Sequence, residues 1–210
     1  MGEAIRTAAS VIAAREGSSG PEVLVVERSA GSRFLPGYVA FPGGATDDED
    51  AAHAARWFGT AGEAPRACAV RELLEEVGLA LTAGGLRPAV PDELEASPPR
   101  VDQLHEIAHW IAPKDVPVRF DARYFAAVAP LDVEPEPDGH ETAHAWWALP
   151  SSLLGDWENG TRKLYWPTYF TMRALAACST VDELLAIRIV TREPDDDEVE
   201  RLPRPTFWQD

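Results

Sequence analysis

The stretch Arg71–Leu79, which reads RELLEEVGL, decides the fold of this sequence. Its acids Glu72, Glu75 and Glu76 stand at i, i+3 and i+4, a spacing that puts their carboxylates on one face of a helix. Like charges at this spacing destabilise an isolated helix, but carboxylate oxygens are the ligands that Mg²⁺ and Mn²⁺ prefer, and bound cations would reverse the repulsion. Arg71 can hold one carboxylate ionised and in place. The alternative interpretation is an ordinary acidic face in contact with solvent.

The helix that carries these acids is predicted over residues 63–77. Pro65 suits its first turn, and Gly78 suits a C-terminal stop. Cys68 lies one turn before Glu72, so it is either a thiol near the metal ligands or a small, partly buried helix residue. The apolar side chains lie on the side away from the glutamates and should pack on a core. They are Ala67, Val70, Leu73, Leu74 and Val77.

The segments before this helix predict a hairpin, an unusual turn and another helix. Residues 7–14 and 22–27 are apolar and partly β-branched, and a Gly/Ser-rich turn lies between them, which is typical of two paired strands. Residues 41–44, FPGG, require an unusual backbone path. Residues 47–60 predict a helix with acids in its first turn, as the helix dipole prefers.

The segments after the helix predict a mixed succession of elements. These are a helix over 101–110, one or two strands over 116–130, an acidic and proline-rich loop over 132–139, a strand over 142–149, and closing helices over 167–178 and 181–189.

Composition narrows the class of protein. The chain has 210 residues, 35 acidic against 19 basic side chains, and a formal net charge of −16. This balance excludes a nucleic-acid polymer or an anionic membrane as the main partner, although metal ions can reconcile it with a small anionic substrate. Two distant cysteines, no secretory signal and no long apolar run predict a soluble, cytoplasmic protein. The oligomeric state is left open, with a homodimer among the options.

Residues 63–79 resemble the Nudix box, whose pattern is Gly, five residues, Glu, seven residues, then Arg-Glu-apolar-any-Glu-Glu-any-Gly-apolar. Glu63 is followed by seven residues and then by Arg71–Leu79, which matches every position of the second part. Phe41–Gly44 resembles the strand and loop that lead into the box. The sequence departs from the pattern at one place, because eighteen residues rather than five separate Gly44 from Glu63.

The resemblance implies an α/β Nudix fold, a mixed β-sheet sandwiched between α-helices, with helical insertions. We expect a single Nudix hydrolase domain over 1–192, an insertion at about 45–60 within the box, and an acidic C-terminal tail at 193–210. The activity implied is metal-dependent cleavage of the diphosphate bond in a nucleoside diphosphate derivative, with Mg²⁺ or Mn²⁺ as cofactor.

The resemblance also implies roles for individual residues. Glu72, Glu75 and Glu76 are the implied metal ligands, and any one of them can be the base that deprotonates the attacking water. Arg71 completes this catalytic set. The Gly43 carbonyl is an implied backbone ligand.

Two further acids extend the implied metal site. Glu63 is expected to support the ligands. Because members of the family often recruit a carboxylate from a later loop, Glu141 is the candidate here, with Glu136 behind it. The alternative is that both loop acids are merely solvated.

Secondary motifs point to a subgroup. The interrupted box, Trp110–Pro113 and Arg119–Phe125 together resemble the peroxisomal coenzyme A diphosphatases. This resemblance implies coenzyme A or an acyl derivative as substrate, with ADP-ribose, NADH and dinucleotide polyphosphates as alternatives.

Two functions of other classes are also considered. Residues 105–109 read HEIAH, which matches the HExxH pattern of zinc metallopeptidases if the segment is helical, with His105 and His109 as ligands and Glu106 as base. A non-catalytic Nudix-like binding module is less consistent with the sequence, because all four box acids are present.

Four residues are candidates for substrate binding. Arg33, Arg119 and Arg123 suit phosphate groups, although arginines in an acidic protein are equally suited to pairing with carboxylates. Trp147 suits stacking on a base, although one of Trp146 and Trp147 should belong to the core because they alternate along a strand.

Overall fold

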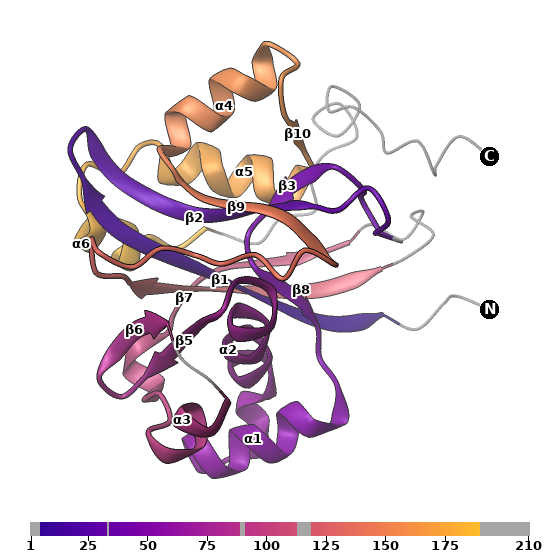
Figure 1. Cartoon of the computed structure of the whole chain (residues 1–210), viewed down its shortest axis with the longest axis vertical. Helices are drawn as coiled ribbons and strands as arrows, with labels where there is room; N and C mark the ends of the chain where they lie inside the picture. Colours follow the sequence, from indigo (N-terminus) through magenta and orange to yellow (C-terminus); the bar gives the residue numbers. More distant parts are fainter. Residues whose placement is uncertain (1–4, 33, 89–90, 113–118, 190–210) are drawn as a thin grey trace.

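The computed structural model describes residues 5–32, 34–88, 91–112 and 119–189. In this part of the chain an eight-stranded mixed sheet lies between two groups of helices (Figure 1). The sheet contains β1 Arg6–Gly17, β2 Gly20–Arg28, β3 Tyr38–Ala40, β4 Gly43–Ala45, β7 His105–Ile111, β8 Phe120–Val128, β9 Thr142–Ala148 and β10 Lys163–Leu164. A separate hairpin pairs β5 Leu79–Thr82 with β6 Gly85–Pro88.

The helices divide between the two sides of the sheet (Figure 1). One side carries α1 Asp48–Phe58, α2 Ala64–Val77 and α3 Pro91–Ala96, together with the β5–β6 hairpin. The other side carries α4 Pro150–Glu158, α5 Trp166–Leu175 and α6 Val181–Ala186. No described helix is long and apolar enough to span a membrane.

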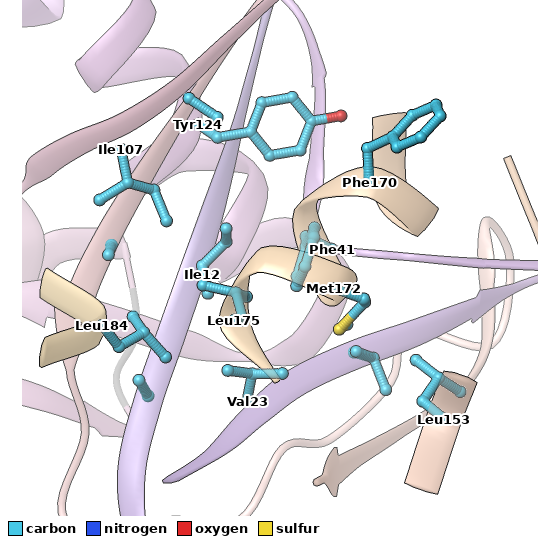
Figure 2. Packing of buried hydrophobic residues seen from close by; sticks show 14 of the residues in the cluster. Ile12, Val23, Phe41, Ile107, Tyr124, Leu153, Phe170, Met172, Leu175 and Leu184 are labelled. Carbon is cyan, nitrogen blue, oxygen red and sulfur yellow. The ribbon is translucent and has the colours of Figure 1, made fainter. Parts of the chain in front are cut away.

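The central strands are buried on both faces, so successive side chains belong to two different cores. In β1, Val11 and Ala13 face α2, whereas Ile12 faces α5. Figure 2 shows the core on the α5 side, where Met172 and Leu175 lie among the side chains of the sheet. Burial on both faces explains why these strands read as apolar runs rather than as an alternation of apolar and polar residues.

The sheet splits in its middle. β1 and β2 pair as antiparallel strands only near their shared turn, as far as Ala14 and Val23. Beyond that point β4 pairs with residues 8–10 of β1, while β3 pairs with Val26 and Glu27 of β2. On their outer sides, β1 pairs with the parallel strand β8 and β2 with the antiparallel strand β9, and β7 pairs with the far side of β8. The diverging strands leave room for the cleft described below.

Most sequence-based expectations of secondary structure are confirmed. The expected hairpin, the helix over 47–60, the helix over 63–77 and the strand over 142–149 correspond to β1–β2, α1, α2 and β9. The helix expected over 101–110 is wrong, because residues 105–111 form β7 and pair with β8. The β5–β6 hairpin and α4 were not anticipated. The expected acidic tail at 193–210 lies outside the described residues.

Candidate active site

Four glutamates line one pocket beside α2. Glu72, Glu75 and Glu76 come from the helix, and Glu141 comes from the loop before β9. Arg71, Asp138 and His140 complete the lining of this feature, called the acid pocket. Three of the four glutamates were brought together by helical spacing, as predicted, whereas Glu141 arrives from a segment more than sixty residues away.

Two of these carboxylates are buried rather than on a solvent-exposed face. Glu76 is 4% exposed and Glu72 is 9% exposed, whereas Glu75 lies at the surface. The loop that leads into the box presses against them. The N–H of Gly43 donates to Oε2 of Glu76 at 3.0 Å. A Cβ on Gly44 would lie 2.6 Å from Cδ of Glu72, so only glycine allows this close approach.

Burial has a direct electrostatic consequence. It raises the pKa of Glu76 to about 8, and the neighbouring charge of Glu72 adds to the rise. Burial also raises the pKa of Glu72, an effect that the charge of Arg71 partly offsets. Both carboxylates therefore lack the positive charge that would fully stabilise them as anions.

Arg71 is the cation at the centre of this arrangement. Its Nη1 donates to Oε1 of Glu72 and to Oε2 of Glu75, both at 2.8 Å. Its Nε and Nη2 donate to the two carboxylate oxygens of Asp50 at 2.9 and 3.1 Å. Asp50 lies in the insertion and is completely buried. It was not singled out from the sequence, because nothing local distinguishes it from its acidic neighbours in α1.

Main-chain hydrogen bonds attach the loop that carries Glu141 to α2. The N–H groups of Glu136 and Asp138 donate to the carbonyls of Val77 and Glu76 at 2.9 and 3.0 Å. The Asp138 side chain then accepts from the N–H groups of residues 140, 141 and 142. These bonds fix Glu141 at the rim of the acid pocket, whereas Glu136 is not among the described residues that line the pocket.

The donor set of the acid pocket fits a divalent cation. In the part of the chain that the structure describes, no three acidic, histidine or cysteine side chains form a preformed metal site. Arg71 and the Gly43 N–H occupy oxygens of the three box glutamates. However, four hard oxygen donors converge here, and the raised pKa values of two of them would fall on binding a cation. Glu72, Glu75, Glu76 and Glu141 could therefore hold Mg²⁺ or Mn²⁺.

A second, mainly apolar cleft continues from the acid pocket. Its volume is about 440 Å³, and Glu72 and Glu141 line both features. The cleft occupies the split in the sheet, and its walls include residues of β1–β4, β8 and the start of α5. This feature, called the aromatic cleft, is lined by Phe34, Tyr38, Trp110, Phe120, Tyr124 and Tyr165 among others.

Two arginines that the sequence did not single out line the aromatic cleft. Arg28 donates its Nε to the carbonyl of Phe34 at 2.8 Å, and its charge lowers the pKa of Glu76 against the larger opposing effect of burial. Arg6 lies over the ring of Phe120, with its Cζ at 5.7 Å from the ring centroid. Among the described ion pairs neither arginine has a carboxylate partner.

The structure places the other predicted site residues elsewhere. Glu63 precedes α2 and pairs with Arg66, and it is not among the described residues of the acid pocket. Cys68 is completely buried, and burial raises the pKa of its thiol, which donates to the Gly44 carbonyl. The thiol is therefore a protonated core group that supports the loop.

Three of the four residues predicted to bind substrate are engaged elsewhere in the structure. Arg123 pairs with Glu106 at 3.1 Å, and Arg119 donates to the carbonyl of Ala112. Trp147 donates its Nε1 to the Val133 carbonyl at 2.9 Å and packs against the core on the α2 side. None of these three is among the described residues of the aromatic cleft. Arg33 lies outside the described residues.

The zinc-peptidase interpretation is wrong. It requires a helix that presents His105 and His109 one turn apart, but both residues lie on β7. His109 contacts Asp121 on the neighbouring strand, and Glu106 is engaged by Arg123. The pairing of β7 with β8 therefore uses these side chains as cross-strand partners.

A mixed sheet between helices, split over a cleft and bordered by a glutamate-bearing helix, defines an α/β protein of the Nudix class. The chain belongs to the Nudix family. The family model for the NUDIX domain matches residues 4–165. This range runs from β1 to β10 and contains the acid pocket, the insertion and the lining of the aromatic cleft up to Tyr165.

Relatives and solved structures agree with this assignment. The chain is 32% identical to a NUDIX hydrolase from Alicyclobacillus acidocaldarius, and the match covers 89% of this chain and 98% of the other with a TM-score of 0.78. A Caenorhabditis elegans protein provisionally named nudix hydrolase 7 is 27% identical over an alignment of 190 residues, and the match covers 81% of this chain. The chain spans 60% of that relative's length.

More distant structures share the fold alone. The NUDIX domain of Shewanella oneidensis NrtR, solved with ADP ribose, is 12% identical with a TM-score of 0.54, over 81% of this chain and 86% of its own. An Ap4A hydrolase from Caenorhabditis elegans is 15% identical with a TM-score of 0.52, over 82% of this chain and 96% of its own.

Proposed function

We propose that this protein is a divalent-metal-dependent hydrolase that cleaves the diphosphate bond of a nucleoside diphosphate derivative, and that coenzyme A or acyl-coenzyme A is the substrate. One observation carries the proposal: four glutamates converge on a pocket that opens directly into an aromatic cleft of about 440 Å³. A diphosphate at the glutamates would leave the rest of the molecule against the aromatic walls.

The chain's own residues support hydrolysis at the acid pocket. Glu72, Glu75, Glu76 and Glu141 would hold Mg²⁺ or Mn²⁺, which supplies charge stabilisation of the diphosphate oxygens and a lower pKa of water. The Gly43 N–H anchors one oxygen of Glu76, which limits the motion of that carboxylate. Arg71 donates through Nη1 to one oxygen of Glu72 and one of Glu75, which orients both carboxylates. The glutamate that accepts the proton from water is one of the three on α2.

The coenzyme A assignment rests on the segments that resemble the diphosphatase subgroup. Trp110, Ala112, Phe120, Ala122 and Tyr124 belong to these segments, and all five line the aromatic cleft. The resemblance therefore concerns the wall that a substrate would touch. Arg28 and Arg6 add cations along this wall, which suit a ligand with several phosphate groups.

An activity screen tests the proposal. Coenzyme A, acetyl-coenzyme A, ADP-ribose, NADH and a dinucleotide tetraphosphate are each incubated with the protein and Mg²⁺ or Mn²⁺, and the products are identified by mass. We expect 3′,5′-ADP and a phosphopantetheine from coenzyme A. Preferential cleavage of ADP-ribose, NADH or the dinucleotide would contradict coenzyme A as the substrate but would support cleavage of a diphosphate bond.

Matched variants separate this activity from a contaminant. Glu75→Gln in the acid pocket should abolish most of the product, whereas Glu158→Gln on the exposed part of α4 should leave the rate unchanged. Turnover that survives both Glu75→Gln and Glu76→Gln would sink the enzymatic assignment.

A further inference from the structure

The insertion within the box supplies a buried carboxylate that pairs with Arg71, a residue of the acid pocket. Residues 45–62 separate Gly44 from Glu63, and most of them form α1, which packs beside α2 (Figure 1). Asp50 in the first turn of α1 is 0% exposed. A buried carboxylate is tolerated only where charge and hydrogen bonds compensate for lost water, so its partners reveal its role.

The partner of Asp50 is Arg71, which it engages along one edge of the guanidinium. Nε and Nη2 of Arg71 each donate to a different oxygen of Asp50, at 2.9 and 3.1 Å. Nη2 also donates to the carbonyl of Ala45 at 3.3 Å. Only Nη1 is directed to the glutamates, where Glu72 and Glu75 share it. The guanidinium thus bridges the insertion and the acid pocket.

Asp50 is itself held by the N-terminus of its helix. The N–H of Asp47 donates to Oδ2 of Asp50 at 3.0 Å, and Oδ1 of Asp47 accepts from the Asp50 N–H at 3.1 Å. This reciprocal capping fixes the first turn of α1 and therefore the direction of the Asp50 carboxylate.

Resting on the function proposed above, we propose that Asp50 is a positioning residue that limits how much of Arg71 reaches the metal-binding glutamates. While Asp50 occupies Nε and Nη2, Arg71 offers Glu72 and Glu75 a single nitrogen between them. Without Asp50, the freed edge of the guanidinium would form a two-point pair with one of these carboxylates, and this pair would compete with a cation. Loss of one negative charge acts in the same direction.

The test measures Mn²⁺ binding by electron paramagnetic resonance of the free ion, without turnover. Asp50→Asn should weaken Mn²⁺ binding about 10-fold, which is the usual effect of losing a group that orients metal ligands. Glu49→Gln, on the exposed side of the same turn, should bind as the wild type does. Wild-type affinity in folded Asp50→Asn overturns the proposal.

A double variant separates positioning from general support of the fold. If Asp50 acts chiefly through Arg71, Asp50→Asn should cost much less Mn²⁺ affinity in the Arg71→Gln background than in the wild type. An equal loss in both backgrounds would overturn the proposal. If Asp50→Asn does not fold, Arg71→Lys replaces it, because a lysine cannot bridge Asp50 and the glutamates at once. Wild-type Mn²⁺ affinity in Arg71→Lys would then contradict the role.

Failure of the proposed function is distinguishable in the same assay. Glu72→Gln and Glu76→Gln should abolish Mn²⁺ binding. If they do and Asp50→Asn binds normally, only the role of Asp50 fails. If they leave Mn²⁺ binding intact, the metal site itself is wrong.

Discussion

The acid pocket and the aromatic cleft meet at Glu72 and Glu141, but they are held in different ways. The acid pocket depends on charge: buried carboxylates, one guanidinium and main-chain N–H groups. The aromatic cleft depends on ring packing, as between Phe34 in the loop after β2 and Phe120 at the start of β8, whose centroids are 5.5 Å apart. This difference indicates that the acid pocket carries out the proposed reaction and that the aromatic cleft selects the substrate.

The largest expected effect is a loss of kcat on substitution of a glutamate in the acid pocket. Glu76→Gln should lower kcat about 10³-fold, the scale seen when one preorganised electrostatic group is removed. The fold should survive, because the Gly43 N–H can donate to the new amide oxygen. Steady-state hydrolysis at a Mg²⁺ concentration that saturates the wild type measures the loss, with Glu158→Gln as control. A kcat within tenfold of the wild type would contradict a reaction centred on these glutamates.

A smaller loss of kcat should follow when a metal-binding carboxylate is displaced rather than removed. Gly44→Ala would put a Cβ 2.6 Å from Cδ of Glu72 and force that carboxylate to move. A displacement of about 1 Å at a reacting centre costs about 10² in rate, and we expect a fall in kcat of that size. Gly155→Ala in α4, where an added Cβ meets no atom within 4 Å, is the matched control. Equal activity of the two variants would argue against close packing at Gly44.

Substitution of a ring in the aromatic cleft should weaken substrate binding and leave kcat nearly unchanged. Phe34→Ala removes a ring that packs edge-on against Phe120 and Tyr165. If this wall holds a planar part of the substrate, KM should rise about 10-fold with kcat nearly unchanged, because stacking on a base is worth about 1–3 kcal/mol. Phe58→Leu, at the end of α1, controls for loss of a ring elsewhere. A fall in kcat at constant KM would break the proposed division between the two ends.

The smallest expected effect is on the thermal stability of the protein, measured with a chelator present to remove divalent cations. The pKa of Glu76 is raised to about 8 in the fold, chiefly by burial, so the folded state binds a proton that the unfolded chain releases near its ordinary pKa of about 4.3. Stability should therefore fall as pH rises from 6 to 8.5. We expect the melting temperature to drop about 3 °C more in the wild type than in Glu76→Gln. Saturating Mg²⁺ should reduce this difference in melting temperature between the two proteins. A melting temperature that falls more steeply with pH in Glu76→Gln than in the wild type would contradict the prediction.

The parts of the site that the sequence predicts are those encoded locally. Glu72, Glu75 and Glu76 converge because of helical spacing alone, and Gly78 ends the helix with a left-handed φ of 65°, as expected. Asp50 and Arg28 could not be found in this way, because each reaches the site through packing or strand pairing between distant segments.

The HEIAH segment shows how pairing overrides a local pattern. Residues 105–109 fit a helix by motif and a strand by their neighbours, and the pairing of β7 with β8 decides between them. His109 lies opposite Arg123 in that pair and contacts Asp121 diagonally across it, a relation invisible without the register. The hairpin β1–β2 was predictable because its two strands adjoin in sequence, whereas β8 joins β1 only through a long connection.

The attachment of the Glu141 loop to α2 has a consequence for evolutionary drift. The bonds from residues 136 and 138 to the helix carbonyls use main-chain atoms, which every residue except proline can supply as donors. Most side chains of this loop are therefore free to change while the chain still delivers an acid to the same point. In diverged relatives the fourth carboxylate should be recognised by its place at the end of α2, and not by any conserved run of letters around it.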